Sequence, residues 1–186
     1  MSLKICLLGA ALFAAVAISP ALGQAAPPTP NVPATRATIS SSDFVTRAAV
    51  TDRYEIAAAR IAEKRSHDSA IDRFAARMIA EHGRNSTELR SLAKRIGGLR
   101  LPARLDEQHK GLIEQLKAVD RKQFDTTYAQ QQIQGHRDAI ALFTGYSRHG
   151  DNPKLRQFAN ATLPVLEHHL HMAQALPVGP RVAGGR

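Results

Sequence analysis

The sequence predicts an all-α fold, a four-helix bundle made of two antiparallel hairpins. Three observations indicate this class. Apolar residues recur at spacings of three and four, the period of one helix face, through the middle of the chain. Alternating strand patterns are absent, and the composition has few aromatic residues and no Trp. Helix caps and helix-ending glycines then divide this stretch into separate helices.

The first half of the predicted bundle contains two long helices. Ser41, Ser42 or Asp43 can cap a first helix that runs to about residue 65. Asp68 can cap a second, which is expected to end where Gly97 provides the usual stop signal.

The second half contains a short helix and two more long ones. The short helix is expected over about residues 105–118, because leucines recur on one of its sides. Asp120 can cap a third long helix that Gly150 closes. Asn152, followed by Pro153 at the first helical position, opens a fourth that runs to about residue 176.

The lengths of the connections predict the topology. Very short links join the first helix to the second and the third to the fourth, so each pair must be antiparallel neighbours. The link between the pairs is about 20 residues long and can run about 30 Å along the bundle with its own short helix. Two hairpins joined by a long crossover make the ferritin-like arrangement, in which the two hairpin turns lie at opposite ends.

One polar residue interrupts the apolar core line of each long helix. At seven-residue steps Glu55 lies between Ala48 and Ala62, and the same pattern surrounds a histidine in each of the other three helices. Burying a carboxylate costs several kcal/mol unless it is paired or bound to a cation. The four residues expected in the core are therefore candidate metal ligands: Glu55, His82, His136 and His169.

The distances of these residues from the hairpin turns place them near one height of the bundle. Glu55 and His82 lie about 12 and about 15 residues from the first turn, and His136 and His169 about 14 and about 19 from the second. One coordination sphere could therefore hold all four. Three imidazoles and a carboxylate suit one zinc, copper(II) or iron(II) ion. Met78, one turn from His82, could add a soft ligand, although a core methionine usually only packs.

A metal-free interpretation stays open at this stage. Glu55 could pair with His82 or His136 and with Asn85 in a closed polar network that sets the helix register. A third possibility is an enzyme that uses one metal ion with an open coordination position. That function would need a pocket that reaches His136 or His169 from solvent.

The N-terminal residues predict export. Lys4 and the apolar run that follows resemble a signal peptide, and Ala21-Leu22-Gly23 provides a cleavage site before Gln24. The run is too short for a membrane-spanning helix, which needs about 20 apolar residues. The only cysteine, Cys6, lies within this segment, so the mature chain has no thiolate ligand. The expected domains are a signal peptide (1–23), a Pro/Ala-rich linker (24–40), the helical bundle (41–176) and a disordered tail (177–186).

The net charge of +9 indicates which partners the protein attracts and says nothing about its fold. In an exported protein it predicts weak attraction to anionic cell-envelope components, such as lipid, lipopolysaccharide or polysaccharide. The basic residues are scattered over outer helix positions without the interleaved aromatics of a base-stacking surface, so nucleic acid is not expected as a partner.

Short motifs on all four long helices resemble one known family. They are Phe44-Val45 with Glu55-Ile56, Phe74-Ala75 with Met78 and His82, Phe124-Asp125 with Tyr128 and His136, and Phe158-Ala159 with Leu163-Pro164 and His169-Leu170. In this order they are similar to the bacterial ferritin-like family catalogued as domain of unknown function 4142. The resemblance covers residues 43–176. It implies the fold and export, because family members are described as exported membrane or outer-membrane proteins, and it implies no activity.

The spacing of Glu and His residues in this sequence can be compared with that of the di-iron proteins of the ferritin-like fold. Those proteins use a Glu-x-x-His motif on two helices and a Glu on each of the other two. Glu81 directly precedes His82 and Glu167 lies two residues before His169, so neither pair has the required spacing. No nucleophile turn, phosphate loop or pair of acid–base carboxylates is present either. The sequence therefore favours an exported accessory or stress-related protein that binds one metal ion over a catalyst.

Overall fold

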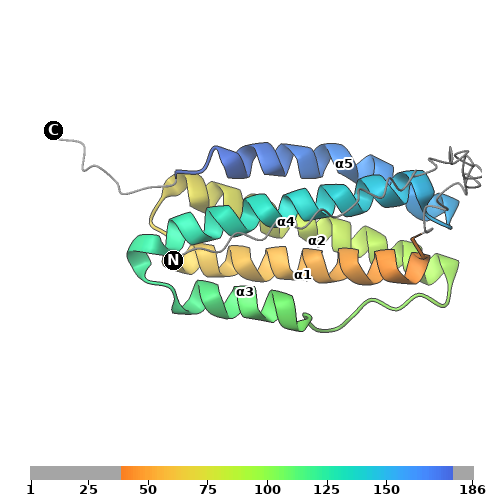
Figure 1. Ribbon diagram of the computed structural model, residues 1–186, viewed down its shortest axis with the longest axis horizontal. Coiled ribbons are helices and arrows are strands. Elements are labelled where there is room, and N and C mark those ends of the chain that lie inside the picture. Colours follow the sequence, from red (N-terminus) through yellow and green to blue (C-terminus); the bar gives the residue numbers. More distant parts are fainter. Residues whose placement is uncertain (1–38, 178–186) are drawn as a thin grey trace, which may run out of the picture. The chain divides into compact units, whose positions relative to one another are not determined.

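The computed structural model describes residues 39–177, which form five α-helices and no strand (Figure 1). The all-α prediction is confirmed for this part of the chain. The expected signal peptide, nearly all of the linker and all but Pro177 of the expected tail lie outside the described residues. The helices are α1 (Ser41–Arg65), α2 (Ser69–Ile96), α3 (Glu107–Ala118), α4 (Arg121–His149) and α5 (Pro153–Gln174).

The N-cap of the first helix lies one residue before the earliest residue expected for it. Ser40 is the N-cap, and its hydroxyl accepts a hydrogen bond from the Asp43 N–H at 3.1 Å. The prediction of a cap at Ser41, Ser42 or Asp43 was therefore wrong. Ser40 takes the role because it places the Asp43 carboxylate in the first turn, where the positive end of the helix dipole stabilises it.

The other helix ends follow the expected residues closely, except that Asp120 precedes α4 without a capping hydrogen bond from its side chain. Asp68 caps α2 by accepting from two backbone N–H groups, and Asn152 caps α5 in the same way ahead of Pro153. Gly97 ends α2 with a φ of 83°, a conformation that favours glycine. The short helix α3 starts at Glu107, two residues later than expected, because the Asp106 side chain caps it.

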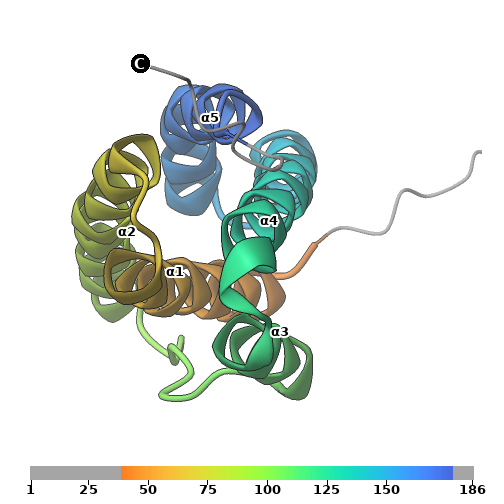
Figure 2. The same ribbon diagram turned by 90° about the vertical axis from the view of Figure 1, so that its left-hand side faces the viewer.

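Two antiparallel hairpins, α1–α2 and α4–α5, form the bundle, and α3 lies on the connection between them (Figure 1). Figure 2 shows the four long helices around one centre, with α3 outside them against α1 and α4. The start of α1 lies beside the α4–α5 turn, because the Ser41 N–H donates to the Asp151 carboxylate at 3.1 Å. The two hairpin turns therefore lie at opposite ends of the bundle, as the connection lengths predicted.

The core consists of two apolar clusters with a polar layer between them. One cluster joins the first turns of α1 and α5 to the last turns of α2 and α4, and the other fills the opposite half. On every long helix the buried polar residues lie where one cluster gives way to the other. Met78 belongs to the second cluster and is fully buried there, so it packs as an ordinary core residue. The buried polar side chains of the bundle core are Asp52, Glu55, His82, Gln132, His136 and His169.

Within residues 39–177, none of the helices has both the length and the apolar character needed to cross a bilayer.

Candidate metal centre

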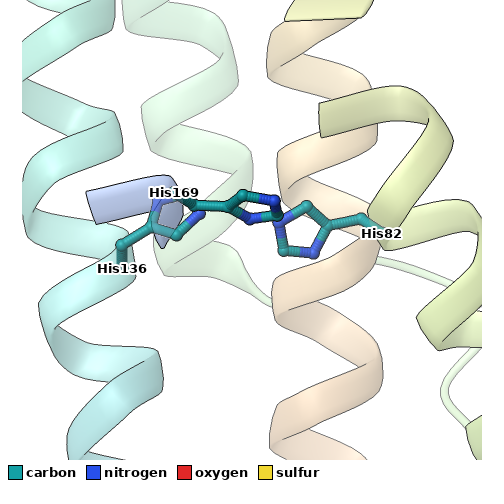
Figure 3. A group of neighbouring side chains, drawn as sticks. All are labelled: His82, His136 and His169. Carbon is teal, nitrogen blue, oxygen red and sulfur yellow. The ribbon is translucent and has the colours of Figure 1, made fainter. Parts of the chain in front are cut away.

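Three histidines from three different helices meet in the polar layer (Figure 3). His82 comes from α2, His136 from α4 and His169 from α5, and one ring nitrogen of each lies within 4.8 Å of the other two. The ring centroids are 5.7 Å apart between His82 and His136, and 5.3 Å apart in each pair that includes His169. All three residues are at most 2% exposed. Their heptad positions predicted that these side chains point inward. The structure agrees on α5, where His169 is buried and the neighbouring His168 is exposed.

His82 is oriented by a network of hydrogen bonds to α1. Its Nδ1 lies 2.8 Å from an oxygen of Asp52, a carboxylate that is itself 2% exposed. The Asn85 amide donates to both oxygens of Asp52, and the Ser86 hydroxyl donates to one of them. Because an ionised carboxylate can only accept, Asp52 accepts the Nδ1–H of His82, and Nε2 of the neutral ring carries the lone pair.

His136 and His169 are each held by one acceptor. The Nδ1 of His136 lies 2.8 Å from the Gln132 carbonyl oxygen, which can only accept, so His136 donates through Nδ1. The Nε2 of His169 lies 2.5 Å from an Oε atom of Glu81. Arg77 and Arg84 lie 3.2 and 3.5 Å from the other Glu81 oxygen and hold the carboxylate in place.

In its neutral form each histidine therefore has one nitrogen occupied as a donor and one nitrogen with a lone pair. The remaining nitrogens are the Nε2 atoms of His82 and His136 and the Nδ1 atom of His169. All three are buried and have no hydrogen-bond partner among the described protein atoms. Metal-binding histidines have this arrangement, in which a carboxylate or carbonyl accepts from one nitrogen so that the other is free to coordinate.

Glu55 is buried beside the histidines but is not a member of the three-nitrogen group. Neither of its carboxylate oxygens makes a hydrogen bond of ordinary geometry among the described residues, although the Gln132 side chain is near enough to oppose the rise that burial causes in the pKa of Glu55. It faces α4, where an added Cβ at Gly135 would lie only 2.9 Å from one Glu55 oxygen. A glycine at this position leaves room for the carboxylate, so the α1–α4 contact is adapted to it.

Burial and neighbouring charges shift the pKa values of these groups in different directions. Burial raises the pKa of Glu55 to about 7, against a smaller opposing effect of His82. Burial lowers the pKa of His136 to about 3 and that of His169 to about 4, and the charge of His82 adds to both shifts. Burial also opposes the charged form of His82, but the hydrogen bond and charge of Asp52 outweigh it and raise the pKa of His82.

The polar network that the sequence left open as the metal-free alternative exists, but with a different carboxylate. Asp52, rather than Glu55, binds His82 and Asn85, so the predicted Glu55 pairing was wrong. Asp52 is one turn before Glu55 on α1 and so shares its inward face, which is the signal that could have identified it. Glu81 was also missed as a partner of His169, because the sequence showed only its lack of di-iron spacing.

A cleft between α2 and α5 reaches the histidines from the surface. It has a volume of about 270 Å³, and its lining includes His82, His169 and Glu81. The exposed residues Arg84 and Val165 belong to the same lining. We refer to it below as the α2–α5 cleft. It satisfies the access condition that an open coordination position would need.

The chemical capacity of this centre follows from its donors. Three neutral imidazole nitrogens and one carboxylate are the ligand types of zinc, copper(II) and iron(II) sites. Two tetrahedral zinc-bound nitrogens lie about 3.3 Å apart, given Zn–N bonds of about 2.0–2.1 Å. The histidine nitrogens need to approach one another by no more than about 1.5 Å to reach that spacing, a distance that small side-chain rotations can cover.

Two solved structures share this fold. One is described as "CopM in the Cu(II)-bound form", with a TM-score of 0.64 and 13% sequence identity over 75% of this chain and 96% of that one. The other is a DUF305 fragment from Deinococcus radiodurans, with a TM-score of 0.64 and 12% identity over 72% of this chain and 92% of that one. At these identities the similarity shows a common helical fold. No curated protein sequence matches the chain significantly.

A family model provides the sequence relationship that the fold similarity does not. The model for DUF4142, a domain of unknown function, matches residues 26–176. The match covers all five helices and every residue of the histidine centre. The chain therefore belongs to the DUF4142 family.

Proposed function

We propose that this protein binds one divalent metal ion in the centre of its bundle. His82, His136 and His169 provide three nitrogen ligands, and Glu55 completes the coordination with its carboxylate. Asp52, Glu81 and the Gln132 carbonyl act on the histidines rather than on the ion.

One observation carries the proposal: three histidines with a nitrogen of each within 4.8 Å of the other two all have a buried ring nitrogen to which no described protein atom donates. A buried acceptor without a partner costs about 1–3 kcal/mol. Three such acceptors close together add repulsion between their lone pairs. A cation at their centre removes both costs, and the unpartnered charge of Glu55 then lies next to an opposite charge.

The ligand set supports zinc, copper(II) or iron(II), and copper(II) is the first ion to test. The mature sequence that we expect has no cysteine, so the softest ligand type is missing. Copper(II) has the highest affinity for a nitrogen and oxygen site among these ions. The structural neighbour that carries a Cu(II) description supports the choice by its common fold.

The setting we propose is the periplasm or the secreted fraction. The apolar N-terminal segment and its cleavage site support export, and the family resemblance agrees with it. The two-hairpin arrangement supports a ferritin-like bundle with one metal ion in place of a di-iron centre. An accessory or stress-related role fits a protein that sequesters one ion in its core.

A metal-free structural module is the second candidate, and one observation favours it. The Asp52 carboxylate has donors for both oxygens, so that part of the layer is satisfied and can fix the α1–α2 register without any ion. The Glu55 oxygens and the three remaining histidine nitrogens have no such donors among the described residues.

Metal titration of purified protein tests the proposal. Protein stripped with a chelator and dialysed should bind one equivalent of copper(II) or zinc by calorimetry, and the copper(II) form should give an electron paramagnetic resonance spectrum with nitrogen hyperfine structure. H136A should lose the site. H168A, which removes the exposed neighbour of His169, should keep it. Absence of binding in the parent protein would leave the structural module.

A further inference from the structure

The α2–α5 cleft is the feature of the molecule that the proposed function leaves without a role. At its inner end are His82 and His169, both at most 2% exposed. At its outer end is Val165, which is 41% exposed and is the only large hydrophobic side chain in the described part of the chain that is exposed. The cleft therefore connects solvent to two of the three proposed ligands.

The three larger surface cavities do not provide this connection. The cavity of about 560 Å³ lies along α2, and none of the three histidines lines it. The lining of the cavity of about 810 Å³ between α1, α3 and α4 includes Tyr54 and Gly135 but none of the three histidines. The cavity of about 980 Å³ at the α1–α2 turn contains His67 but no member of the centre. The helix packing agrees, since α2 and α5 pack less extensively than the α1–α4 pair does.

Two carboxylates, Glu81 and Glu88, and one guanidinium, Arg84, line the cleft, so the carboxylates outnumber the cations there although the whole chain is basic. The net charge of +9 repels cations on average, so local carboxylates must provide any attraction. Glu88 is exposed at the outer end, and Glu81 lies further in with its side chain 19% exposed. Glu81 contacts His169 directly, so one carboxylate spans the distance from the cleft to a proposed ligand.

We propose that the α2–α5 cleft is the path by which a hydrated divalent cation enters and leaves the centre. Glu88 attracts the cation at the outer end, and Glu81 receives it from the cleft before the histidine nitrogens replace its water ligands. The proposal rests on the proposed metal site, and it concerns the rate of exchange rather than the affinity.

Blocking the cleft separates these two quantities. A161F and V165F place a large ring in the cleft from two neighbouring positions on α5. The matched control is N160F, an exposed α5 residue that does not line the cleft. In stopped-flow mixing with copper(II), A161F and V165F should load about tenfold more slowly than the parent protein, because the ion must wait for the helices to separate. N160F should load at the parent rate, and all proteins should reach the same stoichiometry and final spectrum.

Reversing the charge at the outer end tests the electrostatic step. E88K should slow copper(II) loading by about two- to fivefold at low ionic strength, and salt at about 1 M should remove the difference. E63K makes the same charge change at an exposed position of α1 away from the cleft and should have a smaller effect.

The outcomes for the path and for the site are distinct. If the parent protein binds no ion at equilibrium, the metal site itself is wrong. If the parent binds one ion but folded A161F or V165F loads as fast as N160F, the cleft is not the path. Either folded variant is enough for this decision, and circular dichroism establishes that it is folded.

Discussion

The Asp52 carboxylate and the His82 ring form a buried pair, with Oδ1 and Nδ1 2.8 Å apart and each side chain no more than 4% exposed. The pair joins α1 to α2 at the height of the three-histidine centre. Because Asp52 accepts from Nδ1, it determines which His82 nitrogen remains for a ligand. A carboxylate in this position also raises the basicity of the coordinating nitrogen.

Changing Asp52 to Asn should weaken metal binding without removing any proposed ligand. The amide keeps the size of the side chain but loses the charge and one acceptor. We expect the affinity for zinc or copper(II) to fall by about 10- to 100-fold. The stability of the stripped protein should also fall by roughly 1–3 kcal/mol, because Asn85 or Ser86 loses an acceptor.

Competition with a chromophoric chelator measures the change in metal affinity. The control is D138N, which changes an exposed residue on α4. Unchanged affinity in D52N would contradict the orienting role.

Metal should raise the melting temperature of the stripped protein. A ligand that binds only the native state adds about 2.7 kcal/mol at a hundredfold excess over Kd. For a domain of this size the shift is on the order of 5–10 °C. H82A should show no shift, whereas H67A, which changes an exposed histidine at the α1–α2 turn, should keep it. A melting temperature that does not respond to zinc or copper(II) in the parent protein would contradict the metal centre.

Glu55 should make the stripped protein less stable as the pH rises. The folded-state pKa of Glu55 is about 7, above its ordinary value of 4.5, so the native state holds a proton that the unfolded chain has lost between these values. Stability is therefore lost between about pH 4.5 and pH 7, by about 3 kcal/mol in total. E55Q lacks this titration. The difference in free energy of unfolding between E55Q and the parent should grow with pH across that window in urea denaturation experiments. A constant difference would show that the Glu55 carboxylate is not desolvated.

Replacing Gly135 by Ala should not stabilise the protein, although the glycine lies inside helix α4. Replacing a glycine in a helix interior by alanine usually stabilises a protein by about 0.5–1 kcal/mol. An added Cβ at Gly135 would meet the Glu55 carboxylate at 2.9 Å, so G135A should lose this gain and weaken metal binding. Gly111 on α3 has no atom within 4 Å of an added Cβ, and G111A should show the ordinary gain. Equal stabilisation by the two substitutions would show that Glu55 can move away without cost.

Export should remove residues 1–23. The apolar run and the small residues before Gln24 predict that the mature chain begins there or within a few residues. Cell fractionation followed by N-terminal sequencing measures this directly. Protein recovered from the cytosol with Met1 intact would contradict the predicted location.

Much of the architecture could be read from local sequence signals. Asp68, Gly97 and the Asn152-Pro153 pair determine where helices begin and end through bonds and φ angles within a few residues. Short links force neighbouring helices to be antiparallel whatever the details of their packing. The inward direction of His82, His136 and His169 also follows from position alone, because a seven-residue repeat keeps a residue on one helix face.

The tertiary structure decided which groups touch. Helix arithmetic locates a residue to about one turn, or about 5.4 Å, whereas a hydrogen bond requires about 2.7–3.2 Å and a defined angle. The difference is enough to exchange Asp52 for Glu55 as the partner of His82 and to bring Glu81 to His169. It also determines that Glu55 lies against Gly135 and that a cleft opens between α2 and α5. These contacts depend on the rotation and offset of separate helices, which packing across the whole core sets and no local pattern encodes.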